Sequence, residues 1–255
     1  MGLRRRIEGP GRLSRLVVGR EDDAGEGRSL SAGLVSTRWD AEYRDGRYAA
    51  EPPLPFAGEI VAALRAHPGA LGGTGLYVGC GNGRNYLPLV DAGLDLQGLD
   101  VSREAIEQLT ARRPELEPRL ACRDFLDLEI DAVFDYLVAI QVFQHGVAAD
   151  AAAYFAKAAT ALRSGGLLFL RVNSAATEIY FRHTVVEQNR FGGRTIRYEE
   201  GPKEGLRVHF FAREELFDLT RPWFRPLAGP REDVMHRAPP KTGSWAQWEV
   251  VWQKR

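Results

Sequence analysis

The feature that most constrains this chain is the alternation of strand-like and helix-like segments between residues 75 and 172. Short apolar runs predict strands at 75–78, 94–99, 120–122, 134–140 and 167–172. Helical patterns lie between them, at 84–91, 103–111 and 150–163. Strands that alternate with helices indicate βαβ units, whose crossovers are right-handed and whose strands run parallel. We therefore predict an α/β fold built on a parallel sheet.

The segments before this alternation set the limits of the domain. Residues 1–33 are rich in glycine and charge and have almost no periodicity, so we interpret them as a flexible lead. A weak helical pattern over 37–48 contains Trp39 and Tyr43. A stronger one begins at Phe56 and ends at His67-Pro68-Gly69. Residues 34–255 are predicted to form a single domain.

The C-terminal third of the chain predicts antiparallel structure. Residues 195–198 and 206–210 both alternate and flank a turn-rich connection, which indicates a β-hairpin. We interpret 174–211 as an inserted cap, because a long connection in a compact domain usually serves a site. Alternation places His209 with Arg207 on a face that we expect to be solvated. The remaining elements are predicted as a helix at 213–219, a strand at 224–227 and an antiparallel strand at 244–252 that closes the sheet.

A glycine-rich loop, Gly79-Cys80-Gly81-Asn82-Gly83, follows the first predicted strand and opens a helix. Glycines let the backbone turn sharply and approach a ligand, and the helix N-terminus offers unpaired N–H groups. Asp100 ends the next strand, where a carboxylate can accept hydrogen bonds from both hydroxyls of a ribose. A ribose-bearing cofactor is therefore predicted.

The spacing of the glycines bears on which cofactor this is. The dinucleotide fingerprint G-x-G-x-x-G needs a glycine at position 84, where this chain has Arg84. The Lys and Ser/Thr of a phosphate-binding P-loop are also absent from the loop. An NAD(P)-dependent oxidoreductase stays open as an alternative, as does a scaffold that binds a cofactor without catalysis.

Residues 76–85, with Leu99-Asp100-Val101-Ser102, resemble the first two motifs of class I S-adenosylmethionine-dependent methyltransferases. Cys122-Arg123-Asp124-Phe125, 134–145 and 162–168 are similar to later segments of that family. Within it, residues 39–43 and 81–85 look most like the small-molecule branch that includes thiopurine and tellurite-type methyltransferases. The resemblance implies a Rossmann-like, doubly wound, mostly parallel seven-stranded sheet with an antiparallel last strand, plus the inserted β-hairpin cap. It also implies S-adenosyl-L-methionine as the cofactor.

The resemblance implies a set of site residues as well. Those expected to bind the cofactor are Trp39, Tyr43, Gly79, Cys80, Gly81, Asn82, Asp100, Val101, Asp124, Phe125 and Gln141. His145, just beyond the fourth strand, is the candidate catalytic base, with packing as its alternative role. The candidate substrate residues are Tyr180, His183, Arg197 and His209. The expected reaction is methyl transfer to an O, N or S atom of a small molecule, mainly by in-line alignment and without a metal.

Composition limits the partners. Lys and Arg total 34 and Asp and Glu total 34, so net charge gives no pull toward nucleic acid or an anionic membrane. A nucleic-acid methyltransferase stays an alternative, although Ala139-Ile140-Gln141-Val142 lacks the Asn/Asp-Pro-Pro-aromatic element common in base-amino methylation. The apolar runs are too short to span a bilayer, and the two cysteines with no signal-peptide pattern predict a cytoplasmic protein. A monomer or homodimer is expected.

Overall fold

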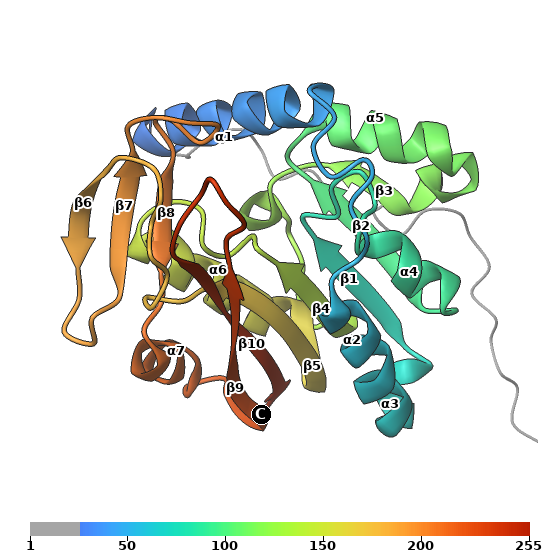
Figure 1. Cartoon of the computed structure of the whole chain (residues 1–255). Coiled ribbons are helices and arrows are strands. Elements are labelled where there is room, and N and C mark those ends of the chain that lie inside the picture. Colours follow the sequence, from blue (N-terminus) through green and yellow to red (C-terminus); the bar gives the residue numbers. More distant parts are fainter. Residues whose placement is uncertain (1–25) are drawn as a thin grey trace, which may run out of the picture.

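The computed structural model describes residues 26–255, and a seven-stranded mixed sheet lies at its centre (Figure 1). Its strands are β1 (Thr74–Val78), β2 (Asp95–Asp100), β3 (Leu120–Cys122), β4 (Phe134–Ile140), β5 (Leu162–Asn173), β9 (Phe224–His236) and β10 (Ser244–Lys254). Their order is β3-β2-β1-β4-β5-β10-β9. Strands β1 to β5 pair in parallel, whereas β10 is antiparallel to both of its neighbours. This confirms the predicted doubly wound, mostly parallel sheet with an antiparallel last strand.

One detail of the sheet prediction is wrong. Strand β10 was expected to close the sheet, but it lies between β5 and β9, so β9 forms the edge. The burial of the two strands agrees with this order. Strand β10 is buried along most of its length, as expected for an internal strand, whereas the edge strand β9 is largely exposed. Strand β9 is also longer than the predicted 224–227, since its backbone pairs with β10 from Phe224 to His236.

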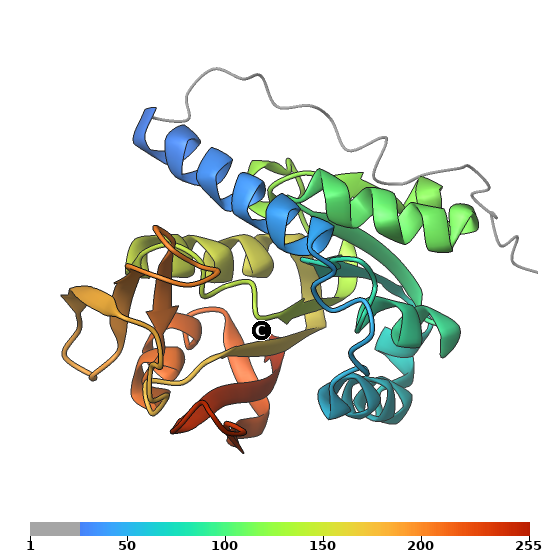
Figure 2. The same cartoon turned by 45° about the horizontal axis from the view of Figure 1, so that its top comes forward.

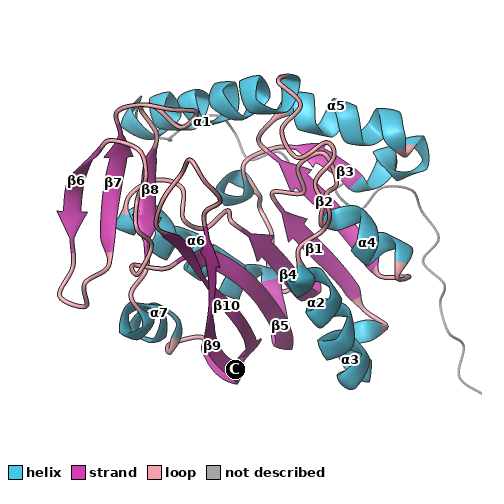
Figure 3. Ribbon diagram, viewed as in Figure 1, coloured by secondary structure: helices cyan, strands magenta, loops and turns pink. Residues whose placement is uncertain are grey.

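Helices cover both faces of the sheet (Figure 3). They are α2 (Pro55–Ala66), α3 (Pro68–Leu71), α4 (Tyr86–Asp91), α5 (Arg103–Arg112), α6 (Ala148–Ala161) and α7 (Arg213–Thr220), with 3-10 turns η2 (Pro114–Arg119) and η3 (Phe125–Asp127). Apolar residues of α6 and α7 share one core cluster with β4, β5 and β10. Those of α2, α4 and α5 form the other cluster, on the opposite face. No helix among residues 26–255 combines the length and apolar character needed to cross a bilayer.

The turn between α6 and β5 differs from its prediction. Gly165-Gly166 was expected to end the helix, but α6 ends at Ala161 and β5 already begins at Leu162. Phe134 pairs with Leu162 and Tyr136 with Leu167, so the residues between them bulge out of the ladder. The glycines therefore serve an irregularity inside the strand rather than the helix stop.

Helix α1 (Glu26–Arg44) begins well before the predicted helix at 37–48. Of the lead predicted over 1–33, residues 1–25 lie outside the described part of the chain and 26–33 are helical. Weak apolar periodicity concealed this start, because a helix without a continuous apolar stripe leaves little pattern in the sequence. Figure 2 shows α1 running from the cap strands to α5, across the carboxyl ends of the central strands.

The cap contains a second, three-stranded sheet: β6 (His183–Gln188), β7 (Arg194–Tyr198) and β8 (Arg207–Phe210). The antiparallel pairing of β7 with β8 confirms the predicted hairpin. Strand β6 was missed because its residues are mostly exposed and therefore do not alternate. The cap is bonded to the loop after β4, since the Gly146 N–H donates to the Arg207 carbonyl at 3.0 Å and the His209 N–H to the Gln144 carbonyl at 2.7 Å.

Candidate functional site

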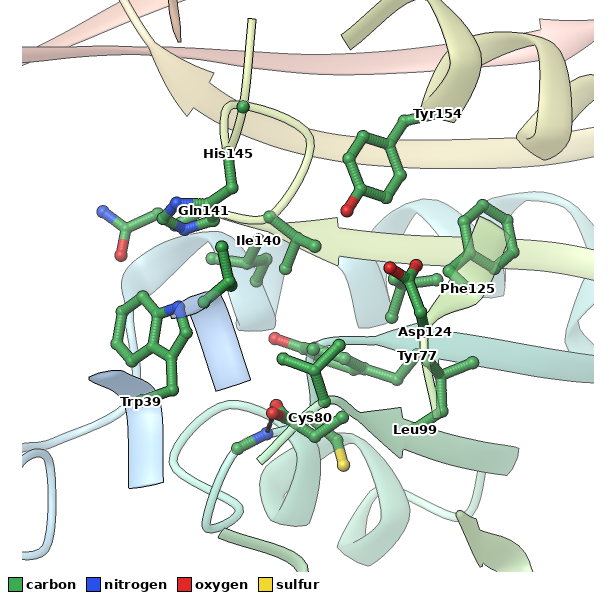
Figure 4. Close-up of a pocket in the computed structure, with 18 of the residues that line it drawn as sticks. Trp39, Tyr77, Cys80, Leu99, Asp124, Phe125, Ile140, Gln141, His145 and Tyr154 are labelled. Atoms are coloured by element: carbon green, nitrogen blue, oxygen red, sulfur yellow. Dashed lines mark hydrogen bonds between the residues drawn. The ribbon is translucent and has the colours of Figure 1, made fainter. Parts of the chain in front are cut away.

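A pocket of about 390 Å³ opens where β1, β2 and β4 end, beneath helix α1 (Figure 4). All eleven residues that the sequence assigned to the cofactor line it: Trp39, Tyr43, Gly79, Cys80, Gly81, Asn82, Asp100, Val101, Asp124, Phe125 and Gln141. His145, the candidate base, lines it too. The structure thus gathers these residues in one place, at the strand edge where doubly wound folds bind ligands.

The glycine loop is fixed at the pocket floor by backbone bonds. The N–H groups of Gly79 and Cys80 both donate to the Leu99 carbonyl, at 2.8 and 3.0 Å, which ties the loop to β2. Gly81 has φ +55°, and a Cβ atom there would lie 2.4 Å from the Tyr43 hydroxyl oxygen. Only glycine fits this position without displacing Tyr43. The Cys80 thiol is buried, which raises its pKa well above the ordinary value and keeps it protonated.

Asp100 is the buried acid of the pocket. Its Oδ2 accepts the Gly81 N–H at 2.8 Å and its Oδ1 accepts the Ser102 N–H at 2.9 Å. Burial raises the pKa of this carboxyl to about 6, even though both hydrogen bonds favour the ionised form. A carboxylate has about four acceptor positions, so two hydrogen bonds from the protein leave acceptor capacity for hydroxyls of a ligand.

An apolar slot continues from Asp100 past β3. Leu99, Val101 and Ile140 contribute to its walls, and Phe125 stacks on Phe143 with ring centroids 6.0 Å apart. Asp124 stands at its edge, where Oδ1 accepts the Leu126 N–H at 2.9 Å and caps η3. The turn-capping role weighed for Asp124 is therefore real, and the same residue also lines the pocket.

His145 lies on the side of the pocket nearest the cap. Its ring meets the Trp39 ring edge-on at 5.4 Å, and its buried Nδ1 has no hydrogen-bond partner among residues 26–255. Burial, with the nearby charge of Lys203, lowers the pKa of His145 to about 3. The Lys203 ammonium itself lies 5.8 Å from the centre of the Trp39 ring and is not among the residues that line the pocket. At ordinary pH the imidazole is therefore neutral.

The four candidate substrate residues do not line the pocket. Tyr180 and Arg197 are exposed at the surface, and His183 is held by the Phe181 carbonyl at 2.9 Å. His209 is 1% exposed, so its predicted solvated face is wrong. Helix α7 covers that face: the ring nitrogens of His209 contact Thr195 Oγ1 at 2.7 Å and Glu215 Oε1 at 2.8 Å.

Several lining residues were not among the predicted site residues, and two of them, Tyr154 on α6 and Arg207 on β8, lie on the side of the pocket nearest the cap. Tyr154 follows Asp150, another lining residue, by one helical turn, and it is a large side chain in an otherwise Ala-rich helix. That contrast could have identified Tyr154 as a candidate site residue from the sequence. For Arg207 the sequence offered only its place among the cationic residues of the predicted cap, because the hairpin carries several arginines and only the packing of β8 against the loop after β4 tells them apart. No group of three or more His, Cys, Asp or Glu side chains in the described chain is arranged to hold a metal ion.

Comparison with known proteins relates this site to a protein family. Residues 76–166 match the family model described as a methyltransferase domain. A cypemycin N-terminal methyltransferase from Streptomyces sp is 35% identical over 81 residues, which cover 32% of this chain. The matched segment spans 33% of that enzyme, about a third of its length.

Solved structures resemble the chain over most of its length. A 1,6-didemethyltoxoflavin-N1-methyltransferase from Burkholderia thailandensis, with bound 1,6-didemethyltoxoflavin and S-adenosylhomocysteine, superposes with a TM-score of 0.61 at 19% identity. That match covers 93% of this chain and 94% of the other. A magnesium protoporphyrin IX methyltransferase from Synechocystis PCC 6803 with bound S-adenosylmethionine gives a TM-score of 0.55 at 15% identity, over 86% and 96% of the two chains. At these identities the likeness establishes the fold.

Proposed function

We propose that this chain, a class I S-adenosylmethionine-dependent methyltransferase, transfers a methyl group to a small organic molecule. The matching methyltransferase domain supports the class, and the small molecule bound in the Burkholderia structure supports the kind of acceptor. The observation that carries the proposal is the buried Asp100 carboxylate beside the backbone of Gly81 in one pocket.

The residues present fit S-adenosylmethionine. The glycine loop brings its backbone to the pocket floor, with Tyr43 packed against Gly81 where a Cβ would stand. Asp100 is an acceptor for ribose hydroxyls, and the apolar residues around Phe125 suit a flat base. When bound, the sulfonium supplies a methyl group that is already activated for transfer. The chain's own task is then to align an acceptor and to keep water out.

Helix α1 and the loop after β4 perform that task in our proposal. Trp39 and Tyr43 of α1 lie over the pocket, and Tyr43 is buried against Gly81. His145 borders the same space as a neutral imidazole, because its pKa is about 3. A group with this pKa is a poor proton acceptor at neutral pH. We therefore assign His145 to hydrogen bonding with the acceptor rather than to removing its proton.

The charge state of Asp100 predicts how cofactor affinity depends on pH. Its pKa of about 6 means that the carboxylate loses its charge as the pH falls through 6, and with it an acceptor for the ribose. The affinity for S-adenosylhomocysteine should hold between pH 7 and 8 and fall by up to about tenfold per pH unit below 6. Calorimetric titrations between pH 5 and 8 measure this, and a flat profile would exclude Asp100 as the titrating contact.

Substitution of His145 tests its role. Because a neutral imidazole and an amide both form hydrogen bonds, His145→Gln should lower kcat by less than about tenfold, whereas loss of a general base costs about 100-fold or more. The rate is measured with the first acceptor that a metabolite panel identifies. His183→Gln, a change of the same kind outside the pocket, is the control. A loss of about 100-fold confined to His145→Gln would restore the base assignment.

Cofactor binding separates this function from its rivals. A thermal-shift panel of S-adenosylmethionine, S-adenosylhomocysteine, NAD and NADP should show stabilisation by the first two compounds. Stabilisation by NAD or NADP would favour the oxidoreductase, for which Arg84 stands where a third glycine is needed. Turnover on a metabolite panel then tests the scaffold alternative. The single domain over 34–255, the cap as the acceptor side and the monomer or homodimer stay proposals.

A further inference from the structure

The wall of the pocket contains a cation that forms no salt bridge within the described chain. Arg207 lines the pocket and is exposed, and within residues 26–255 its guanidinium has no ion pair and no side-chain hydrogen bond. Arg84, another lining arginine, is already committed: it pairs with Glu51 at 2.9 Å and donates to the Pro52 carbonyl at 2.8 Å. The charge available to a ligand is therefore that of Arg207.

The backbone of Arg207 is held next to the acceptor side of the pocket. Its carbonyl accepts the Gly146 N–H at 3.0 Å, and the adjacent Val208 forms a β-bridge with His145. These bonds join β8 to the loop after β4, so the position of Arg207 relative to His145 does not depend on a free loop. The arginine is presented by a strand, which places it more reproducibly than a loop would.

Two acids near this surface accept hydrogen bonds from other groups. Glu187 of β6 accepts the Thr195 hydroxyl at 2.6 Å and the Ala148 N–H at 2.6 Å, and Asp150, which lines the pocket, accepts the Val147 N–H at 2.8 Å. The charge of Arg207 helps to lower the pKa of Glu187, but the two side chains form no salt bridge. Guanidinium groups favour planar oxyanions, to which they can donate two parallel hydrogen bonds.

We propose that Arg207 binds an anionic group of the methyl acceptor, so that the acceptor is a planar molecule with a carboxylate or similar oxyanion. The planar part follows from the aromatic side chains of Trp39 and Tyr154, which lie on two sides of the cavity in Figure 4. This inference rests on the proposed function, because it places the acceptor beside the cofactor in the same pocket. In this proposal Arg207 recognises the acceptor, in place of the four residues that the sequence suggested: Tyr180, His183, Arg197 and His209.

Arg197 provides a matched control. It lies directly opposite Arg207 in the β7–β8 register, so the two side chains leave the cap sheet on the same face, and both are exposed. Arg197 belongs to the strand farther from the pocket, does not line it, and has its guanidinium 3.5 Å from Glu199. Arg207→Gln and Arg197→Gln remove the same charge from neighbouring strands. Neither side chain is buried, so both variants should fold.

The probes are 2-naphthoate and its neutral isostere 2-naphthamide, titrated calorimetrically into protein saturated with S-adenosylhomocysteine. The wild-type protein should bind 2-naphthoate more tightly than the amide. Arg207→Gln should weaken 2-naphthoate about tenfold or more and leave the amide unchanged, because only the anion gains charge-assisted hydrogen bonds. Arg197→Gln should change neither.

The outcomes that overturn the inference are distinct from those that overturn the proposed function. Equal affinity of the two probes, binding of neither probe, or equal losses in the two variants would each exclude Arg207 as an anion site. S-adenosylhomocysteine binding is measured first and without probes. Its absence would reject the proposed function, whereas normal binding with equal probe affinities would reject only the role of Arg207.

Discussion

Replacing Gly81 by valine should abolish measurable cofactor binding while the sheet stays folded. A Cβ at this position would lie 2.4 Å from the hydroxyl oxygen of Tyr43, and φ +55° is strained for a β-branched residue by about 1–2 kcal/mol. The loop can relieve this only by moving its backbone, which also moves the N–H that Asp100 accepts. We expect the Kd of S-adenosylhomocysteine to rise about 100-fold or more, equivalent to about 2.8 kcal/mol.

The control for this change is Gly93→Val. Gly93 also has a positive φ, +89°, but a Cβ there would meet nothing within 4 Å, and the residue lies in the turn before β2, away from the pocket. Both variants should lose stability in denaturant titrations, because both carry the same kind of backbone strain. Only Gly81→Val should lose the cofactor. Equal retention of S-adenosylhomocysteine by the two variants would contradict the loop's role in binding.

The centre of the main sheet could be predicted because its strands are buried on both faces. Such strands appear as short continuous apolar runs, and residues 134–140 were predicted with the bounds of β4, which is almost entirely buried. Residues 120–122 were also predicted with the bounds of β3, although this edge strand is only partly buried. The same argument fails at the cap, where β6 has five exposed residues of six and its valines, Val185 and Val186, face solvent. A strand without a buried face leaves no pattern to detect.

The cofactor side of the pocket could be predicted because its residues are local in sequence to strand ends. Gly81 and Asp100 each follow or end a strand, and parallel strands bring their carboxyl ends to one edge. The resemblance to a known family added Trp39 and Tyr43, whose helix the sequence places only weakly. In the structure all four of these residues line the pocket. Their contact with a cofactor stays a prediction.

The acceptor side could not be predicted, because it depends on how the cap packs. Arg197 and Arg207 are equivalent in the sequence of the hairpin, and the bonds from β8 to Gln144 and Gly146 decide which of the two strands lies beside the pocket. His209 alternates as a surface residue should, yet α7 brings Glu215 onto its ring and buries it. Tertiary contacts between distant segments override the local pattern in both cases.

Substitution of Asp100 gives the second large effect. Asp100→Ala removes the carboxylate that faces both the Gly81 N–H and the pocket, so a bound ribose loses its acceptor and the loop loses an anchor. Charge-assisted hydrogen bonds of this kind contribute about 1–3 kcal/mol, which predicts a loss of about 10- to 100-fold in S-adenosylhomocysteine affinity. Asp95→Ala, at the other end of the same strand and outside the pocket, should leave the affinity unchanged.

The pH profile of Asp100→Asn separates lost chemistry from lost shape. The amide keeps the size of the side chain but cannot titrate, so the decrease in affinity expected below pH 6 in the wild-type protein should disappear. Its NH₂ group can also face the Gly81 N–H, where two donors would oppose each other. A variant that binds weakly at pH 7.5 and equally weakly at pH 5.5 would fit a carboxylate in direct contact with the cofactor. A variant that keeps the wild-type pH dependence would mean that another group titrates, and Asp100 would then be only a support for the glycine loop.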